Sequence, residues 1–208
     1  MKNIKDIITQ GEINHSWALF IDRDGVINQR RIKDYVKTWE QFIFIDQVLE
    51  SLDVLSSLFG RMVIVTNQRG IGRGLMSEAD LEEIHQRMLE EIHQTGGRID
   101  QIYHCPDLEE NDHRGWRKPK IGMALQAKQD FPDIDFKKSI MIGDAISDME
   151  FGRNAGMYTV YVTQEEEIEV GHVCGASPSF QEAIRYENSL IDLRVKSMGE
   201  FCELLITK

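Results

Sequence analysis

The sequence predicts a three-layer α/β/α fold built around a central parallel sheet. Short apolar segments of strand length alternate along the chain with segments whose apolar residues recur at helical spacing. Such alternation is typical of strand–helix–strand units, whose strands lie parallel. Polar and charged residues follow directly after several of the expected strands. Ligands of open parallel sheets bind at the carboxyl ends of the strands, so these residues are the candidates for function.

The expected core begins at residues 17–21, WALFI, a short apolar segment that ends in charge and is predicted to be a buried strand. Apolar residues then recur at helical spacing from 46 to 59, and Gly60 provides a stop signal for that helix. RMVIVT, at 61–66, is the second expected strand, and it runs into the glycine-rich loop NQRGIGRG. These segments form the first strand–helix–strand unit.

The next helix begins at Ser77, which has capping-box spacing to Asp80, and ends at Gly96 and Gly97. RIDQIYH, at 98–104, is predicted to be the third strand. The polar stretch 105–117 that follows has no periodicity.

The last third of the chain continues the alternation. The pattern predicts a helix over 121–131, a strand over 139–143, a short helix that ends at Gly156, and a strand over 157–162. Residues 163–189 are first acidic and then contain glycine, serine and proline, and we expect the most mobile backbone there. A last strand, IDLRV, and an amphipathic helix, SMGEFCELLI, are expected within 190–207. We therefore expect one domain over 1–208, with its core at about 15–162.

Composition limits the classes of function. The 208 residues carry a formal net charge of −11, which disfavours general affinity for nucleic acids or anionic membranes. Three widely spaced cysteines favour a reduced intracellular protein over a disulfide scaffold. The N-terminal residues lack an apolar stretch of signal-peptide length, and no apolar run approaches a membrane span. We expect a cytoplasmic protein with neither nucleic-acid nor membrane partners.

Two aspartates, Asp22 and Asp24, follow the first expected strand. Residues at i and i+2 of a strand share one side, so the two carboxylates repel each other unless a cation, a proton or a reacting group lies between them. Thr66 and Asn67 follow the second strand. Three further charged residues are Lys118, within RKPK, and Asp144 and Asp148, within GDAISD.

In this order, the residues indicate phosphoryl transfer. Asp22, Asp24 and Asp144 offer the hard oxygen ligands that Mg²⁺ prefers, and a carboxylate can also act as the nucleophile. A threonine hydroxyl and an asparagine amide can hold phosphoryl oxygens, while Lys118 can neutralise their charge. Each motif alone is also compatible with an acidic turn, a solvated surface or an acidic helix start.

The segments DRDGVIN, VIVTNQ, RKPKIGM and IGDAISDMEFGRNAG resemble, in this order, the four motifs of the haloacid dehalogenase superfamily of phosphatases. Within it the chain is most similar to the histidinol-phosphatase-like branch, and there to the D,D-heptose 1,7-bisphosphate 7-phosphatases. The resemblance covers about residues 15–162. It implies a Rossmann-like fold and hydrolysis of the 7-phosphate of D-glycero-D-manno-heptose 1,7-bisphosphate.

The resemblance also implies a role for each motif residue. Asp22 would be the nucleophile, and Asp24 the general acid and then the general base. Mg²⁺ would be held by Asp22, the main-chain carbonyl of Asp24 and Asp144, with support from Asp148. Thr66 and Lys118 would hold the phosphoryl group, and Asn67 would support the site. Four residues are implied to recognise the substrate: Gln68, Arg69, Arg73 and Arg117.

In this superfamily large cap domains enter after the first motif or between the second and third. Here the intervals between Asp24, Thr66 and Lys118 are short and largely occupied by core elements. The fold is therefore expected to be essentially capless, with loops 25–40, 67–74 and 105–117 around a site for a small phosphorylated sugar. We expect a monomer.

Other readings remain open at this level. Histidinol phosphate, other small sugar phosphates and a polynucleotide 3′-phosphate are alternative substrates, although the charge disfavours the polynucleotide. A receiver-like phospho-accepting signalling domain uses similar residues, but it would place its accepting aspartate on a middle strand. A pseudo-enzyme that only binds ligand is disfavoured because all motif positions are intact.

The loop YHCPDLEENDHRGWRKP departs from the heptose phosphatases, which carry a structural zinc site there. Cys105 is present, but Asp107 replaces the histidine, and Arg114 and Trp116 stand where two cysteines are expected. A closed zinc site needs four ligands in tetrahedral reach. His104, Asp107, Asp112 and His113 could join Cys105, but their spacing matches no known site. We expect no structural zinc.

Overall fold

The computed structural model describes residues 2–163 and 185–207. Within these ranges the chain forms a six-stranded parallel sheet in the order β3-β2-β1-β4-β5-β6. Its strands are β1 (Ala18–Ile21), β2 (Arg61–Asn67), β3 (Gln101–Cys105), β4 (Ser139–Gly143), β5 (Tyr158–Val162) and β6 (Leu193–Val195). The chain runs outward from β1 to β3 on one side and from β4 to β6 on the other. The order therefore switches between β1 and β4, where a ligand crevice is expected.

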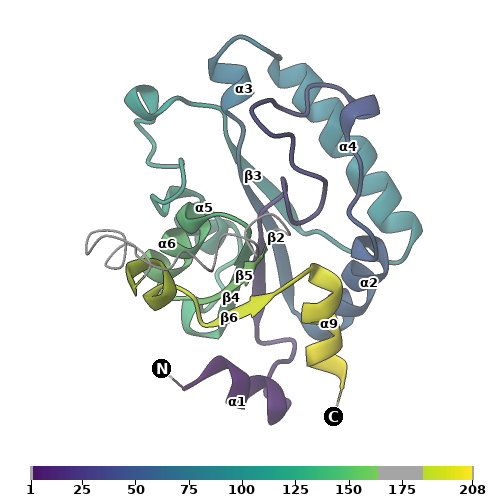
Figure 1. Ribbon diagram of the computed structural model, residues 1–208, viewed down its shortest axis with the longest axis vertical. Coiled ribbons are helices and arrows are strands. Elements are labelled where there is room, and N and C mark those ends of the chain that lie inside the picture. Colours follow the sequence, from purple (N-terminus) through teal and green to yellow (C-terminus); the bar gives the residue numbers. More distant parts are fainter. Residues whose placement is uncertain (1, 164–184, 208) are drawn as a thin grey trace, which may run out of the picture.

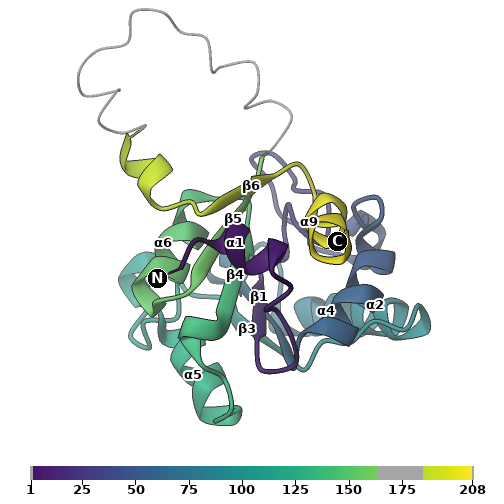
Figure 2. The same ribbon diagram turned by 90° about the horizontal axis from the view of Figure 1, so that it is seen from below.

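Helices cover both faces of the sheet (Figures 1 and 2). One face carries α2 (Val48–Leu58), α4 (Glu78–Gln94) and α9 (Met198–Ile206), and α1 (Ile4–Thr9) packs against α9. The other face carries α5 (Gly122–Asp130) and α6 (Ile146–Ala155). The predicted three-layer fold class is confirmed.

The central strands are apolar on both faces, as a doubly covered parallel sheet requires. In β1, Leu19 and Ile21 belong to the apolar cluster under α2, α4 and α9, while Ala18 and Phe20 belong to the cluster under α5. All four side chains are buried. Because both sides are packed, β1 cannot slip in register without exposing core residues, which fixes where its carboxyl end lies.

The predicted helices and strands agree with the structure to within three residues at each end where the sequence set bounds. The predicted capping box is present: the Ser77 side chain accepts from the Asp80 N–H, and the Asp80 side chain accepts from the Ser77 N–H. The short helices were not predicted: α1, α3 (Arg69–Gly72), η1 (Trp39–Gln41), η2 (Glu109–Asn111) and η3 (Phe136–Lys138). Each has six residues or fewer, too short to show a periodic apolar stripe.

Most of the predicted mobile segment, 163–189, lies outside the described residues, and 185–189 are helical. The described connections between Asp24 and Lys118 contain only core elements and loops, as expected for a capless fold. Among the helices of the two described ranges, none is both long and apolar enough to cross a bilayer.

Candidate active site

The predicted site residues come together at the carboxyl ends of β1, β2 and β4. Ile21 pairs in register with Ile64 of β2 and Ile142 of β4, so the carboxyl ends of the three strands lie at the same edge of the sheet, with β2 continuing to Asn67. A pocket of about 910 Å³ opens above them. Six of the residues named from the sequence as catalytic, metal-shell or phosphoryl-holding line it: Asp22, Asp24, Thr66, Asn67, Lys118 and Asp148.

Lys118 lies at the floor of the pocket and is 3% exposed. Its Nζ lies 2.8 Å from Asp22 Oδ1, 2.7 Å from Asp148 Oδ1 and 2.7 Å from the carbonyl oxygen of Val65. Burial alone would lower the pKa of Lys118, but the Asp148 and Asp22 carboxylates outweigh it and raise that pKa above its usual value. The ammonium therefore stays charged and joins Asp22, which follows β1, to Asp148 in the first turn of α6.

Asn67 places this lysine. The Lys118 N–H donates to Asn67 Oδ1 at 3.0 Å, and Asn67 Nδ2 donates to the Lys118 carbonyl at 3.2 Å. The side-chain amide at the end of β2 thus holds the main chain of Lys118 by both of its polar groups. This contact explains how a residue 51 positions further along the chain reaches the end of β1.

Asp22 has an unusual environment for a carboxylate. The pKa of Asp22 is raised to about 6, because burial and the negative charges of Asp148 and Asp24 raise it more than the positive charge of Lys118 lowers it. A buried carboxylate that has one ammonium partner and other carboxylates close by gains stability from a bound cation or a reacting phosphorus.

Asp24 is surrounded by hydrogen-bond donors. Arg23 Nη2 lies 2.8 and 2.9 Å from its two carboxylate oxygens, Asn28 Nδ2 donates to Oδ1 at 2.9 Å, and Gln68 Nε2 donates to Oδ2 at 2.8 Å. Burial would raise the pKa of Asp24, but the charge of Arg23 and these hydrogen bonds hold it below its usual value. The pKa values of Asp22 and Asp24 are therefore shifted in opposite directions, although one residue separates the two side chains.

The side chain of Gln68 does not lie where the sequence analysis expected it. It was expected to contact substrate, but its side chain is 1% exposed and its Nε2 donates both to Asp24 and to Thr66 Oγ1, at 2.8 Å each. In the structure this side chain joins the two strand ends beneath the pocket.

Asp144 lies behind the pocket floor, next to the turn after β1. Its Oδ1 accepts from Arg30 Nη2 at 2.7 Å. The pKa of Asp144 is raised to about 8, because burial and the negative charge of Asp22 raise it more than the charge of Arg30 lowers it. A Cβ at Gly25 would lie 1.8 Å from Asp144 Oδ2, and Gly25 has φ +96°. Only glycine lets the turn approach this carboxylate so closely.

Three carboxylates could hold a divalent cation. Asp22, Asp144 and Asp148 each offer an oxygen within 4.8 Å of the others. Asp148 is fixed by the first turn of α6, because its Oδ2 accepts from the Ala145 N–H at 3.1 Å. A set of hard, crowded carboxylate oxygens suits Mg²⁺, and a cation there would relieve the mutual repulsion. The side chain of Asp24 is not part of this set, in keeping with the expectation that only its main-chain carbonyl is a ligand.

Cations surround the pocket mouth. Among the residues expected to recognise substrate, Arg69, Arg73 and Arg117 line the pocket. Lys120, from the RKPK segment, lines it as well, and sequence analysis did not single out three further cations of the lining, namely Arg30, Arg31 and Lys33. The run QRRIK directly after the first motif was the available signal. In the described part of the chain, eight cationic and five acidic residues line this pocket of an otherwise acidic protein.

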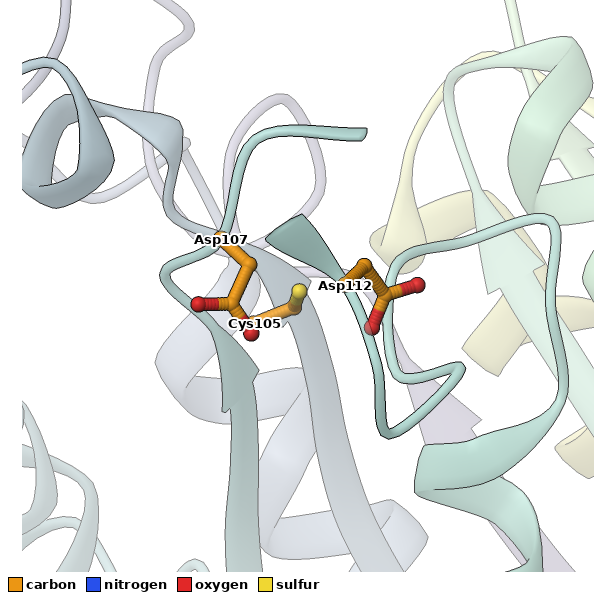
Figure 3. Close-up of side chains that lie close together, drawn as sticks. All are labelled: Cys105, Asp107 and Asp112. Carbon is orange, nitrogen blue, oxygen red and sulfur yellow. The ribbon is translucent and has the colours of Figure 1, made fainter. Parts of the chain in front are cut away.

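The loop after β3 brings together Cys105, Asp107 and Asp112 (Figure 3), whose ligand atoms lie within 4.8 Å of one another. The Asp112 carboxylate already accepts from the main-chain N–H groups of Trp116 and Arg117, at 2.8 and 3.2 Å, and pairs with Lys120 at 3.0 Å. Burial also raises the pKa of the Cys105 thiol, which disfavours the thiolate that zinc requires. These contacts support the prediction of no structural zinc, which stays a prediction.

A parallel sheet with an acidic pair after its first strand, a threonine after the second, a buried lysine and an acidic pair after the fourth defines a phosphatase of the haloacid dehalogenase class. Comparison with known proteins supports this class of phosphatase. The family model described as polynucleotide kinase 3 phosphatase matches residues 18–169. The chain belongs to this family, within the haloacid dehalogenase superfamily of hydrolases.

Curated relatives carry a common name. A D-glycero-alpha-D-manno-heptose-1,7-bisphosphate 7-phosphatase of Campylobacter jejuni is 45% identical over 152 residues, which are 73% of this chain and 85% of that protein. A protein of the same name from Mycobacterium bovis is 39% identical over 140 residues, 67% of this chain and 73% of that protein.

Solved structures share the fold. A D,D-heptose 1.7-bisphosphate phosphatase of B. bronchiseptica, complexed with magnesium and phosphate, aligns with a TM-score of 0.72 at 24% identity, over 91% of this chain and 98% of that one. A putative HAD-like phosphatase of Mesorhizobium loti aligns with a TM-score of 0.62 at 26% identity, over 86% of this chain and 87% of that one.

Proposed function

We propose that this protein is a Mg²⁺-dependent phosphatase that removes the 7-phosphate of D-glycero-D-manno-heptose 1,7-bisphosphate through an aspartyl-phosphate. The arrangement that best supports this reaction is the buried pair of Asp22 and Lys118 beneath a pocket with a cationic mouth. The curated relatives at 39–45% identity bear the name of that activity.

Asp22 is the proposed nucleophile. Its carboxylate oxygen attacks phosphorus, the bond between phosphorus and the C7 oxygen breaks, and the leaving alkoxide takes a proton from Asp24. Because the lowered pKa of Asp24 leaves it ionised in the resting site, Asp24 takes up this proton from solvent before the step. Asp24 then takes a proton from water, whose oxygen attacks the aspartyl-phosphate and releases inorganic phosphate and the Asp22 carboxylate. Lys118, already paired with Asp22, neutralises charge on the phosphoryl oxygens throughout.

The residues proposed to hold Mg²⁺ are Asp22, Asp144 and the main-chain carbonyl of Asp24, with Asp148 orienting the shell. When bound, the ion would neutralise phosphoryl charge and orient the phosphate for in-line attack. Thr66 lines the pocket, and its Oγ1 accepts from Gln68, which supports a role for its hydroxyl as donor to a non-bridging oxygen of the phosphate.

The pocket mouth supports a substrate with a second anionic group. Arg69, Arg73 and Arg117 were named from the sequence, and the structure adds Arg31 and Lys120 around the same opening. Because Arg117 lines the pocket, its guanidinium can pair with an anionic group of the substrate. A bisphosphate would place one phosphate on Asp22 and the other among these cations.

A substrate panel tests this proposal. Phosphate release is measured with Mg²⁺ for both anomers of heptose 1,7-bisphosphate, histidinol phosphate, another sugar monophosphate and a 3′-phosphorylated oligonucleotide. A heptose bisphosphate is expected to give the highest kcat/KM. Asp22→Asn is the matched control, and its activity is expected to fall by at least ~10³-fold. A higher kcat/KM for another substrate would refute the assignment, and an active Asp22→Asn protein would refute the mechanism. Monomeric state and cytoplasmic location stay predictions.

A further inference from the structure

Arg23 is a buried charge that the proposed reaction does not use. It lies between the two catalytic aspartates in the chain, and it is among the largest side chains of the described residues that are fully buried, with 0% exposure. A charge removed from water is strongly destabilising unless it is paired and hydrogen-bonded. Its partners must therefore be specific.

The guanidinium joins two elements. Its Nη2 lies within 2.9 Å of both oxygens of Asp24, and its Nη1 lies 3.3 Å from Nε2 of His85, a buried residue of α4. Arginine has only donors, so His85 Nε2 must be the acceptor and the imidazole proton must lie on Nδ1. Burial and the charge of Arg23 lower the pKa of His85 to about 3, which agrees with a neutral ring.

The main chain of Arg23 organises the turn that carries Asp24. Its carbonyl oxygen faces the N–H groups of Val26, Ile27 and Asn28, at 3.3, 2.8 and 3.1 Å. This tight turn lets the side chains of the neighbouring residues 23 and 24 meet, which neighbours on an extended strand do not do. A displaced Arg23 would therefore move Asp24 through its side chain and through the turn.

We propose that Arg23 and His85 are positioning residues for Asp24. His85 accepts from Arg23 and fixes the plane of its guanidinium, and the guanidinium in turn holds the Asp24 carboxylate at the angle from which it serves the leaving group. This inference rests on the proposed role of Asp24 as general acid and base. The helix α4 thereby contributes to proton transfer without touching substrate.

The test compares His85→Leu, which removes the acceptor, with His85→Gln, which keeps a carbonyl oxygen near the position of Nε2. Each is assayed on a sugar phosphate, whose alkoxide needs an acid, and on para-nitrophenyl phosphate, whose phenolate needs little help. Because general acid catalysis is worth roughly 10²–10⁴-fold, the leucine variant is expected to lose about 10-fold more activity on the sugar phosphate than on the aryl phosphate. In the glutamine variant, the ratio of activity on the sugar phosphate to activity on the aryl phosphate is expected to lie within about 3-fold of the wild-type ratio.

Equal losses on both substrates, or no rescue by glutamine, would overturn the inference. Asp24→Asn distinguishes failure of this inference from failure of the proposed function. If Asp24→Asn loses more activity on the sugar phosphate than on the aryl phosphate and His85→Leu does not, only the positioning role fails. If Asp24→Asn lacks the effect, the acid role itself fails. A second test uses only the wild-type protein and therefore does not depend on the folding of a variant. Nitrogen NMR of the His85 ring is expected to show the proton on Nδ1, and a proton on Nε2 would overturn the inference.

Discussion

His85 should make the protein lose stability on mild acidification, and His85→Gln should remove that loss. The ring is 6% exposed, and burial together with Arg23 lowers its pKa from the usual 6.5 to about 3. The unfolded chain therefore binds a proton at this residue below pH 6.5, while the folded protein does not until about pH 3. Because the unfolded state binds more protons in this window, the stability that His85 contributes is fully present above pH 6.5 and is lost as the pH falls towards 3.

The size of the effect follows from the two pKa values. Between pH 7 and pH 5 the unfolded histidine goes from mostly neutral to almost fully charged, while the folded ring stays neutral. With 1.36 kcal/mol per pKa unit, the free energy of unfolding should fall by about 2 kcal/mol from this residue alone. Other titrating groups also change the free energy of unfolding between these pH values, but their contributions are the same in wild type and variant and cancel in the comparison.

Urea unfolding of wild type and His85→Gln at pH 7 and pH 5, at one Mg²⁺ concentration, measures this difference. Glutamine keeps an acceptor for Arg23, so the variant should fold with the same contact and lack only the titration. We expect the wild type to lose about 2 kcal/mol more than the variant over this interval. Equal losses would show that His85 titrates normally in the folded protein and would refute the environment described for it.

Three further predictions concern the floor of the pocket and the loop beside it. Lys118→Met leaves two buried carboxylates without their ammonium, so metal-free protein should lose about 3–5 kcal/mol of unfolding free energy, and an unchanged urea midpoint would contradict the buried ion pairs. Arg30→Gln removes the half-exposed cation that pairs with Asp144, so protein freed of metal by a chelator should lose about 1 kcal/mol of unfolding free energy. Saturating Mg²⁺ should reduce this difference in stability from wild type if the metal neutralises the same carboxylate. Elemental analysis of purified protein should find far less than one zinc per chain, and Cys105→Ser should retain nearly full activity; one tightly held zinc that is lost in this variant would contradict the contacts of the loop.

The sequence was sufficient for the fold class and for most of the catalytic centre because both depend on local patterns. Apolar periodicity predicts which segments are strands and helices, and the parallel connection rule brings strand ends to one edge. Asp22, Thr66 and Asp144 each stand at the end of an apolar strand, so their convergence followed from the pattern.

Other features of the site depend on contacts between distant residues. Arg23 and His85 are 62 positions apart, and Arg30 and Asp144 are 114 apart. No local pattern distinguishes these side chains from solvated charges or from a histidine on an ordinary helix, because only the packing of α4 and of the turn after β1 decides which of them meet. The resemblance implied that Gln68 recognises substrate, and only the packing shows that its side chain is buried against Asp24 and Thr66.

By itself, the sequence determined the order of strands and helices, the residues that end each strand and therefore the class of chemistry. Tertiary structure alone decided which charges are buried together. It places Arg23 against Asp24, Arg30 against Asp144 and Gln68 beneath the pocket. The physical reason is that strand and helix formation responds to periodicity over a few residues. The pKa and orientation of a catalytic carboxylate respond instead to every charge and donor within a few ångströms, whatever its distance along the chain.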